Sequence, residues 1–283
     1  MQGEMKHDKT PSHRLRRVAR RTALTLAAVT LVYFVPVGIS YVTLTWGEAQ
    51  ASDWRTARRD SAGIAPPVAR EEAGIQAYCA RAFRWRGAFG VHCWLATKPT
   101  GDEHWTRFEV TGWRVMRGGQ AVSVARGIPD GYWYGNAPTL IREVRGGEDV
   151  DTLIERLHEA SGAYPHKDEY RIWPGPNSNT YVAYLGRAVP ELSLDLPPTA
   201  IGKDYLPQAG VIAHAPSGSG MQLSIAGLAG VLIAPQEGLE LNVLGLTAGI
   251  DVWPPALKLP GIGRIGFPSH SGGEGAREAH AAQ

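Results

Sequence analysis

A long apolar run near the N-terminus constrains this chain more than any other feature. Residues 22–46 contain no charged side chain, and the segment before them is crowded with the basic residues Lys6, Lys9, Arg14, Arg16, Arg17, Arg20 and Arg21. A helix needs about 20 apolar residues to cross a bilayer, so the run is long enough. Basic residues stay on the cytoplasmic side of a span, whereas Trp46 suits the opposite interface. We therefore expect a basic cytoplasmic tail over 1–21 and a transmembrane anchor over 22–46.

This topology predicts a single-pass protein of the bacterial inner membrane with its C-terminal domain in the periplasm. A second interpretation stays open, because Ala49-Gln50-Ala51 resembles a signal-peptidase site and the run could be a signal peptide. The run is longer than the apolar core of an ordinary signal peptide, and its length favours the uncleaved anchor.

Charge and motif content exclude several classes of function. The formal net charge is +2, and the basic residues gather in the short tail, so we expect no nucleic-acid partner. The chain has no Gly-rich phosphate-binding loop with a Lys, and we predict no cofactor. His92, His104 and Glu109 could in principle ligate a metal, but no tight ligand spacing supports such a site, and we predict none.

Composition divides the rest of the chain into four segments. We expect a linker over 47–73, an α+β domain over 74–208, a Gly/Leu-rich β extension packed on that domain over 209–267, and a disordered tail over 268–283.

The first half of the domain reads as strands. Short segments rich in aromatic and β-branched residues, separated by Gly or Pro turns, are typical of an antiparallel sheet. They predict a four-stranded meander with strands over 75–83, 89–97, 106–116 and 120–126.

The second half of the domain reads as helices. Apolar residues recur at helical spacing after Pro138, over 148–160 and from Ser178 to Val189, where Pro190 ends the pattern. Strands followed by helices indicate an α+β fold with the helices packed on one face of the antiparallel meander.

The segment 209–267 contains a near repeat. The six residues 223–228, Leu-Ser-Ile-Ala-Gly-Leu, are echoed by Leu-Asn-Val-Leu-Gly-Leu at 241–246. Alternation in both copies favours two paired strands. Residues 221–235 are too short and too Gly-rich for a second span, and they fit an apolar hairpin that either covers the core or rests on the membrane surface.

Two cysteines are available for redox chemistry. If 84–87 form a hairpin turn, Cys79 and Cys93 fall opposite each other on adjacent strands. A disulfide in an oxidising compartment and a pair of buried free thiols both fit this arrangement.

A rigid corner precedes the last predicted helix. Pro174 to Pro176 fix a sharp turn, and Asn177 and Ser178 then occupy the start of an apolar helix. A hydroxyl at the positive end of a helix dipole could act as a nucleophile. Asn177 or Ser178 could equally be an ordinary helix cap.

A base and an orienting carboxylate can be placed beside this hydroxyl. Reflection through a turn near Thr100 sets Glu109 directly opposite His92 on the next strand. A carboxylate fixes the tautomer of an imidazole and raises its basicity. The candidate catalytic set is therefore Ser178 as nucleophile, His92 as base and Glu109 as orienter, with Asn177, Asn179, Trp94 and Trp173 as supporting residues. The alternatives are a structural His92 and a Glu109 paired with a neighbouring arginine.

Two motifs carry a resemblance. The segments 170–180, Tyr-Arg-Ile-Trp-Pro-Gly-Pro-Asn-Ser-Asn-Thr, and 197–205, Pro-Pro-Thr-Ala-Ile-Gly-Lys-Asp-Tyr, resemble the uncharacterised bacterial domain-of-unknown-function family 3750. The likeness extends over about 74–266 and implies no established activity.

A more distant resemblance concerns mechanism. His92-Cys93-Trp94 followed by residues 177–182, Asn-Ser-Asn-Thr-Tyr-Val, is similar to the circularly permuted NlpC-type papain-like superfamily. That resemblance implies a permuted papain-like fold with a strand His and a Cys at a helix start. Ser178 stands where the superfamily has its Cys.

Three functional hypotheses follow. The first is a Ser/His hydrolase or acyltransferase in the cell envelope, acting on an amide or ester of a peptidoglycan peptide or a lipid. The second is a catalytically silent binding or scaffolding module, favoured by the missing Cys and the apolar segment 221–252. The third is an assembly subunit that docks another membrane protein through residues 209–267.

Overall fold

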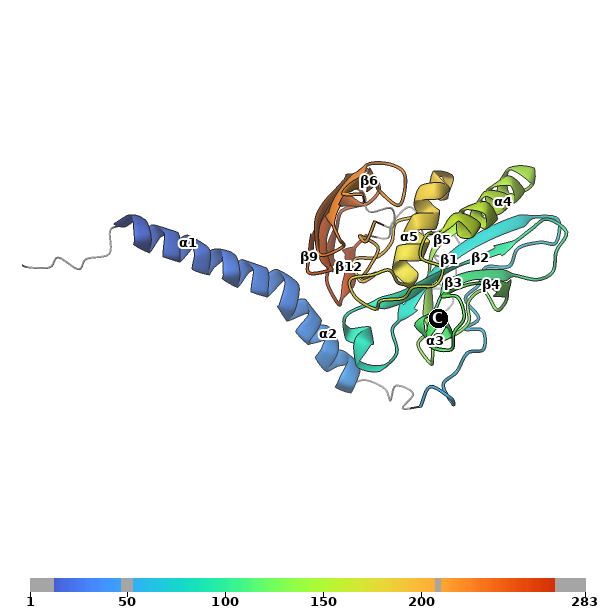
Figure 1. The fold of residues 1–283 in the computed structure, drawn as a ribbon, viewed down its shortest axis with the longest axis horizontal. Coiled ribbons are helices and arrows are strands. Elements are labelled where there is room, and N and C mark those ends of the chain that lie inside the picture. The colour runs from blue at the N-terminus through green and yellow to red at the C-terminus, as the bar shows by residue number, and fades with distance from the viewer. Residues whose placement is uncertain (1–12, 47–52, 207–209, 268–283) are drawn as a thin grey trace, which may run out of the picture.

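The computed structural model describes residues 13–46, 53–206 and 210–267. A long N-terminal helix leads to a body made of two antiparallel sheets, with two helices beside the first sheet (Figure 1). The signal-peptidase-like site at 49–51, the tail at 268–283 and the first twelve residues of the basic tail lie outside the described residues.

The N-terminal helix consists of α1 (His13–Val29), a π-helical turn (Thr30–Phe34) and α2 (Val35–Trp46). Its 33 residues from Arg14 to Trp46 are long and apolar enough, by length and composition, to cross a membrane. In Figure 1, α1 extends away from the body, which the helix meets from its π-helical turn through α2.

The first sheet has five antiparallel strands in the order β4-β3-β2-β1-β5. The expected four-stranded meander is confirmed in β1 to β4, and a fifth strand is added beside β1. The strands are β1 (Ala73–Arg81), β2 (Val91–Lys98), β3 (Thr106–Val110), β4 (Val122–Arg126) and β5 (Pro138–Gly146).

The third predicted strand is wrong beyond Val110. Residues Gly112–Met116 form the short helix α3, in which Trp113 and Met116 are exposed. The apolar side chains resemble a strand pattern, but the chain turns here to bring Ala121 back within hydrogen-bond distance of Thr111.

The helix predicted after Pro138 is also wrong, because this segment is the strand β5. Tyr78 of β1 pairs with Leu140 and Ala77 with Arg142, so one extra residue, Ile141, forms a β-bulge. The bulge lets Ile141 and Val144 face the same core although they are three residues apart. A bulged strand therefore reproduces the apolar spacing of a helix.

The two remaining helix predictions are confirmed by α4 (Glu148–Ala163) and α5 (Ser178–Ala188), and a 3-10 turn (Pro190–Leu192) follows α5. Both helices lie on one face of the first sheet (Figure 1). The main core forms between them and the sheet, and it includes Leu157, Tyr181 and Leu185. The α+β class with helices on one face of an antiparallel sheet is confirmed.

The second sheet has seven antiparallel strands in sequence order. They are β6 (Ile212–His214), β7 (Met221–Ile225), β8 (Ala229–Ala234), β9 (Gly238–Val243), β10 (Leu246–Asp251), β11 (Ala256–Leu259) and β12 (Gly263–Gly266). The hairpin expected over 221–235 is confirmed as β7 and β8.

The two repeat copies form β7 and β9, but they do not pair with each other, because β8 lies between them. Each copy ends in a two-residue turn with positive φ at both positions, Ala226-Gly227 and Leu244-Gly245. Such turns match the twist of a hairpin. The repeat therefore encodes a strand with its turn, and each copy pairs with the strand that follows that turn.

Cys79 and Cys93 pair across β1 and β2 and form a disulfide, with their Cα atoms 4.1 Å apart. Of the two alternatives left open by the sequence, the structure has the disulfide. The connection between these strands is a 3-10 helix (Arg84–Ala88).

Candidate functional site

The start of α5 is a dense hub of hydrogen bonds. Asn177 is the N-cap: its side-chain oxygen accepts from the backbone N–H groups of Asn179 and Thr180, and Thr180 Oγ1 accepts from the backbone N–H of Asn177. This reciprocal arrangement is a capping box, which satisfies N–H groups that a helix start leaves free. Asn177 Nδ2 also donates to the carbonyls of Ile172 and Ile201, at 3.2 and 3.0 Å.

Asn179 ties α5 to β2. Its Nδ2 donates to the carbonyl of Val91 at 2.9 Å, and its Oδ1 accepts from the N–H of Cys93 at 3.1 Å. The pairing of β2 with β3 covers Leu95 to Thr97, so the Asn179 amide supplies partners to β2 beyond that ladder. Asn179 Nδ2 also donates to Ile201 at 2.8 Å.

The second sequence motif packs directly on the first. Thr180 Oγ1 donates to the carbonyl of Gly202 at 2.8 Å. Gly202 has φ +98°, and a Cβ on it would lie 2.6 Å from Cγ of Asn177. Only glycine leaves room for this approach. The segments 170–180 and 197–205 are therefore two halves of one structural unit.

His92 lies on the opposite face of the first sheet from α5. Its neighbour Cys93 belongs to the core shared with Tyr181 of α5, and successive residues of a strand point to opposite faces. The His92 ring stacks on Trp133 with ring centroids 3.5 Å apart, and Trp94 packs beside it. Ser178 belongs to α5, on the other side of the sheet.

Glu109 is on the same face as His92 but is not directly opposite it. The register aligns Leu95 with Phe108, so Glu109 faces Trp94 and reaches His92 diagonally. His92 Nε2 and Glu109 Oε2 are 3.8 Å apart, close enough for an ion pair and too far for a hydrogen bond. Arg107 contacts the same carboxylate oxygen at 2.9 Å. The alternative of a Glu109 paired with an arginine is thus present in the structure.

Burial controls the charge of this pair. It lowers the pKa of the His92 imidazole, and the neighbouring Glu109 only partly offsets that effect. Burial alone would raise the pKa of Glu109, but His92 and Arg107 outweigh it and the pKa is lowered. The arrangement favours a neutral imidazole beside a carboxylate already neutralised by arginine.

The structure does not bring the predicted nucleophile, base and orienter together. The buried Ser178 hydroxyl has one weak contact, 3.5 Å from Oδ1 of Asn179, and His92 contacts Glu109 and Trp133. A shallow depression of about 520 Å³ elsewhere on the surface is lined by Glu103, His104, Arg126 and Asp130, among others, and by neither Ser178 nor His92.

The supporting residues have separate structural contacts. Trp94 is fully buried, its Nε1 donates to the carbonyl of Pro129 at 2.7 Å, and the Arg107 guanidinium lies over its ring. Trp173 is half-exposed, and its Nε1 donates to the carbonyl of Leu244 in the β9–β10 turn at 2.9 Å. The corner before α5 therefore holds the second sheet.

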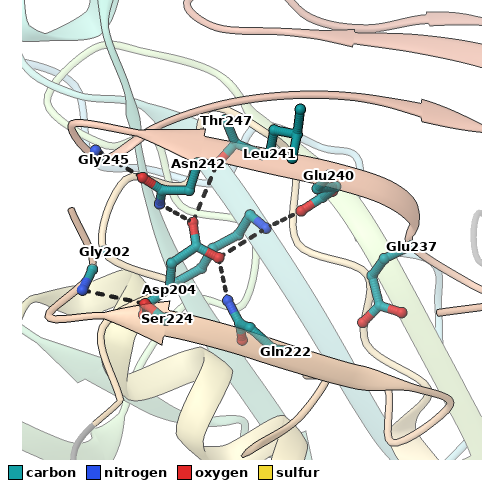
Figure 2. Close-up of polar contacts among 12 residues, drawn as sticks. Gly202, Asp204, Gln222, Ser224, Glu237, Glu240, Leu241, Asn242, Gly245 and Thr247 are labelled. Atoms are coloured by element: carbon teal, nitrogen blue, oxygen red, sulfur yellow. Dashed lines mark hydrogen bonds and ion pairs between the residues drawn. The ribbon is translucent and has the colours of Figure 1, made fainter. Parts of the chain in front are cut away.

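A buried charged network, not foreseen from the sequence, lies between the first domain and the second sheet (Figure 2). At its centre Asp204 accepts hydrogen bonds from Gln222, from Asn242 at 2.6 Å and from Thr247 at 3.1 Å. Lys203 pairs with Glu240.

A second lysine extends the network. Lys258 contacts Glu240 at 2.9 Å, Asp251 at 3.1 Å and Asp195 at 3.2 Å. Burial alone would lower the pKa of Lys258, but the three carboxylates outweigh it and raise that pKa. Burial raises the pKa of Asp195 to about 7, and Lys258 only partly offsets that effect.

The network is closed around its own members. The space beside Asp204, Glu240 and Thr247 has no room for a water molecule. Among the described residues, no group of three or more His, Cys, Asp or Glu side chains could hold a metal ion. The network is therefore suited to fixing the two parts of the body together. The signal in the sequence was the alternation of polar with apolar residues in the two strands that contain the repeats: Gln222 and Ser224 in β7, and Glu240 and Asn242 in β9.

The sequence matches the family described as "Protein of unknown function (DUF3750)" over residues 72–205. Residues 72–205 of this chain belong to that family. The match ends at 205, whereas we expected the likeness to extend to about 266. No curated protein and no solved structure matches the chain significantly. The papain-like resemblance therefore stays a prediction.

The DUF3750 segment covers the five-stranded sheet, α4, α5 and the loop through Tyr205. Both sequence motifs lie inside it and form the hub at the start of α5. The last residues of the segment, Lys203 and Asp204, enter the charged network and meet the second sheet. The end of the DUF3750 segment is thus the physical junction between the two parts of the body.

Proposed function

We propose that this protein is a single-pass membrane protein of the bacterial envelope whose DUF3750 domain is a tethered binding or scaffolding module. Its anchor is the helix 14–46, and its body faces the periplasm. This proposal does not require hydrolysis at Ser178, because the polar residues of the hub are engaged in holding the fold.

One observation favours the binding or scaffolding module over the Ser/His hydrolase. Attack by a serine needs a base within about 3 Å of the hydroxyl, since an unperturbed hydroxyl does not ionise at neutral pH. Ser178 is buried on the helical side of the first sheet, and His92 is stacked on Trp133 on the other side. The hub supports a structural role for Asn177, Asn179 and Thr180 in the same motif.

The anchor is supported by length, composition and charge. The helix contains 33 residues, and five arginines in its first nine positions would stay on the cytoplasmic side: Arg14, Arg16, Arg17, Arg20 and Arg21. The disulfide between Cys79 and Cys93 agrees with an oxidising compartment beyond the membrane.

Membrane fractionation of the full-length protein tests this proposal. We expect the chain to stay in the membrane pellet after alkaline carbonate extraction, and its body to be cleaved by protease added to spheroplasts. The binding arm uses immobilised cell-wall fragments and lipid vesicles. Binding that is equal for the wild type and the Ser178→Ala/His92→Ala variant supports a silent module. Release by carbonate, or turnover of an amide or ester that this variant loses, would overturn the proposal.

A further inference from the structure

The outer face of the second sheet carries aliphatic side chains on all seven strands, with His214 of the edge strand β6 as an exposed polar residue on the same face. Ile225 is 61 % exposed and Ile233 is 64 % exposed, which is unusual for such large aliphatic side chains in the middle of a sheet. The same face carries one or two exposed aliphatic residues on each strand, including Ile212, Leu223, Leu241, Ile250, Leu257 and Ile265.

The inner face of this sheet is polar. In β7, Met221, Leu223 and Ile225 are exposed, while Gln222 and Ser224 between them are buried. In β9, Leu239 and Leu241 are exposed, while Glu240 and Asn242 are buried. A sheet with one face in water normally turns its polar side chains outward. Here the alternation is reversed, as in sheets whose outer face meets lipid.

Contacts between the N-terminal helix and the second sheet indicate how deep the sheet lies in the bilayer. Tyr33 donates from its hydroxyl to the carbonyl of Leu241 at 3.0 Å, and Tyr33 and Val37 pack on Leu246 and Ala248 of β10. The hydrocarbon core of a bilayer is about 30 Å thick and a helix rises about 1.5 Å per residue. Tyr33 is about 16 Å from Thr22 and about 20 Å from Trp46 along the helix axis.

Tyr33 therefore lies inside the hydrocarbon whichever end of the apolar run is aligned with the membrane boundary. The part of β9 that contacts it must lie at a similar depth. Polar side chains that face hydrocarbon at that depth would be costly, and the outer face of the sheet has aliphatic residues instead.

We infer that the outer face of the second sheet is immersed in the hydrocarbon of the bilayer, with lipid acyl chains as its occupant. This inference rests on the membrane anchoring in the proposed function and does not depend on whether the DUF3750 domain binds or catalyses. The sheet cannot cross the bilayer, because its strands have three to six residues and a spanning strand needs about nine to eleven. It meets lipid with its face, and its edge strands β6 and β12 have only three and four residues.

Depth-dependent fluorescence quenching of the full-length protein in nanodiscs tests the inference. A bimane label is placed on Leu223→Cys or Ile233→Cys, with the Cys79–Cys93 disulfide left intact, and the lipid is replaced by brominated phosphatidylcholine. Leu31→Cys in the helix reports on the anchor. Val124→Cys is the matched exposed strand position in the first sheet.

We expect the labels at 223 and 233 to be quenched as strongly as the label at 31, and the label at 124 to be unchanged. Quenching at 31 with none at 223 and 233 would overturn the immersion while leaving the anchor intact. Quenching at none of the positions would overturn the anchor and the immersion together. Oxidative cross-linking between two copies through Leu223→Cys, with no quenching there, would identify a second copy as the occupant and reject lipid.

Discussion

Gly202 lies so close to Asn177 that a Cβ on it would be 2.6 Å from Cγ of the asparagine. The carbonyl of its neighbour Ile201 accepts from Nδ2 of Asn177 at 3.0 Å, and the carbonyl of Gly202 itself accepts from Thr180. Each motif therefore needs the other in place, which explains why both belong to the DUF3750 segment.

Replacement of this glycine should destabilise the whole body. Gly202→Ala adds a methyl group against Asn177 and places alanine at φ +98°. Gly101→Ala is the matched control, because Gly101 has φ +81° and nothing within 4 Å of its added Cβ. We expect Gly202→Ala to lower the free energy of unfolding by about 2–4 kcal/mol and Gly101→Ala by about 1–2 kcal/mol. Chemical denaturation in detergent measures the free energy of unfolding of both variants. Equal losses would contradict the predicted clash between a Cβ at position 202 and Asn177.

Asn179 and Ser178 should differ sharply although they are adjacent. Asn179→Ala leaves Val91 and Cys93 without their side-chain partners and removes one of the two side-chain donors to the Ile201 carbonyl, so we expect a loss of about 2–4 kcal/mol in stability. Ser178→Ala removes only the weak contact at 3.5 Å and should cost less than about 1 kcal/mol. The ranking is read from thermal unfolding of the full-length variants, and a larger effect at Ser178 would contradict the hub.

Lys258 should be essential to the junction between the two parts of the body. Lys258→Met leaves Asp195, Glu240 and Asp251 buried with less positive charge, and we expect a loss of about 3–5 kcal/mol. Arg70→Met, which breaks the exposed pair with Glu103, is the control and should leave the melting temperature almost unchanged. Similar melting temperatures for both variants would show that the network is not structural.

His92 should make stability depend on acid pH. Burial lowers its pKa in the folded protein below the unfolded value of about 6.5, so the unfolded chain binds a proton more readily. This contribution is fully present above pH ~6.5 and is lost as the pH falls from there towards the lowered pKa. His92→Phe keeps a ring against Trp133 and should flatten the decline between pH 7 and 5, whereas the exposed His104→Phe should not. Equal slopes would contradict this assignment.

The sequence predicted correctly those elements that are determined by residues close together in the chain. The apolar spacing of α4, the asparagine at the start of α5 and the facing positions of Cys79 and Cys93 all depend on near neighbours in the chain. The strand β5 was mistaken for a helix because the bulge at Ile141 is set by pairing with β1, which lies more than sixty residues earlier.

The functional site was harder to predict, because strand alternation shows two faces without showing which one is buried. For the second sheet the usual rule would bury Leu223 and Leu241, and the structure buries Ser224 and Asn242 instead. The backbones at His92 and Ser178 lie close together in space, because the side chain of Asn179 hydrogen-bonds to both neighbours of His92. The two side chains are separated because His92 points to the face of the sheet away from α5. The order of the motifs in the sequence does not reveal that face.

The most direct test of the structural role of the hub is labelling of the full-length, membrane-reconstituted protein with a serine-reactive fluorophosphonate, followed by peptide mapping. Because the imidazole of His92 and the hydroxyl of Ser178 lie on opposite faces of the sheet, we predict no adduct at Ser178 and identical profiles for the wild type and Ser178→Ala. An adduct at Ser178 that disappears in His92→Ala would contradict the account.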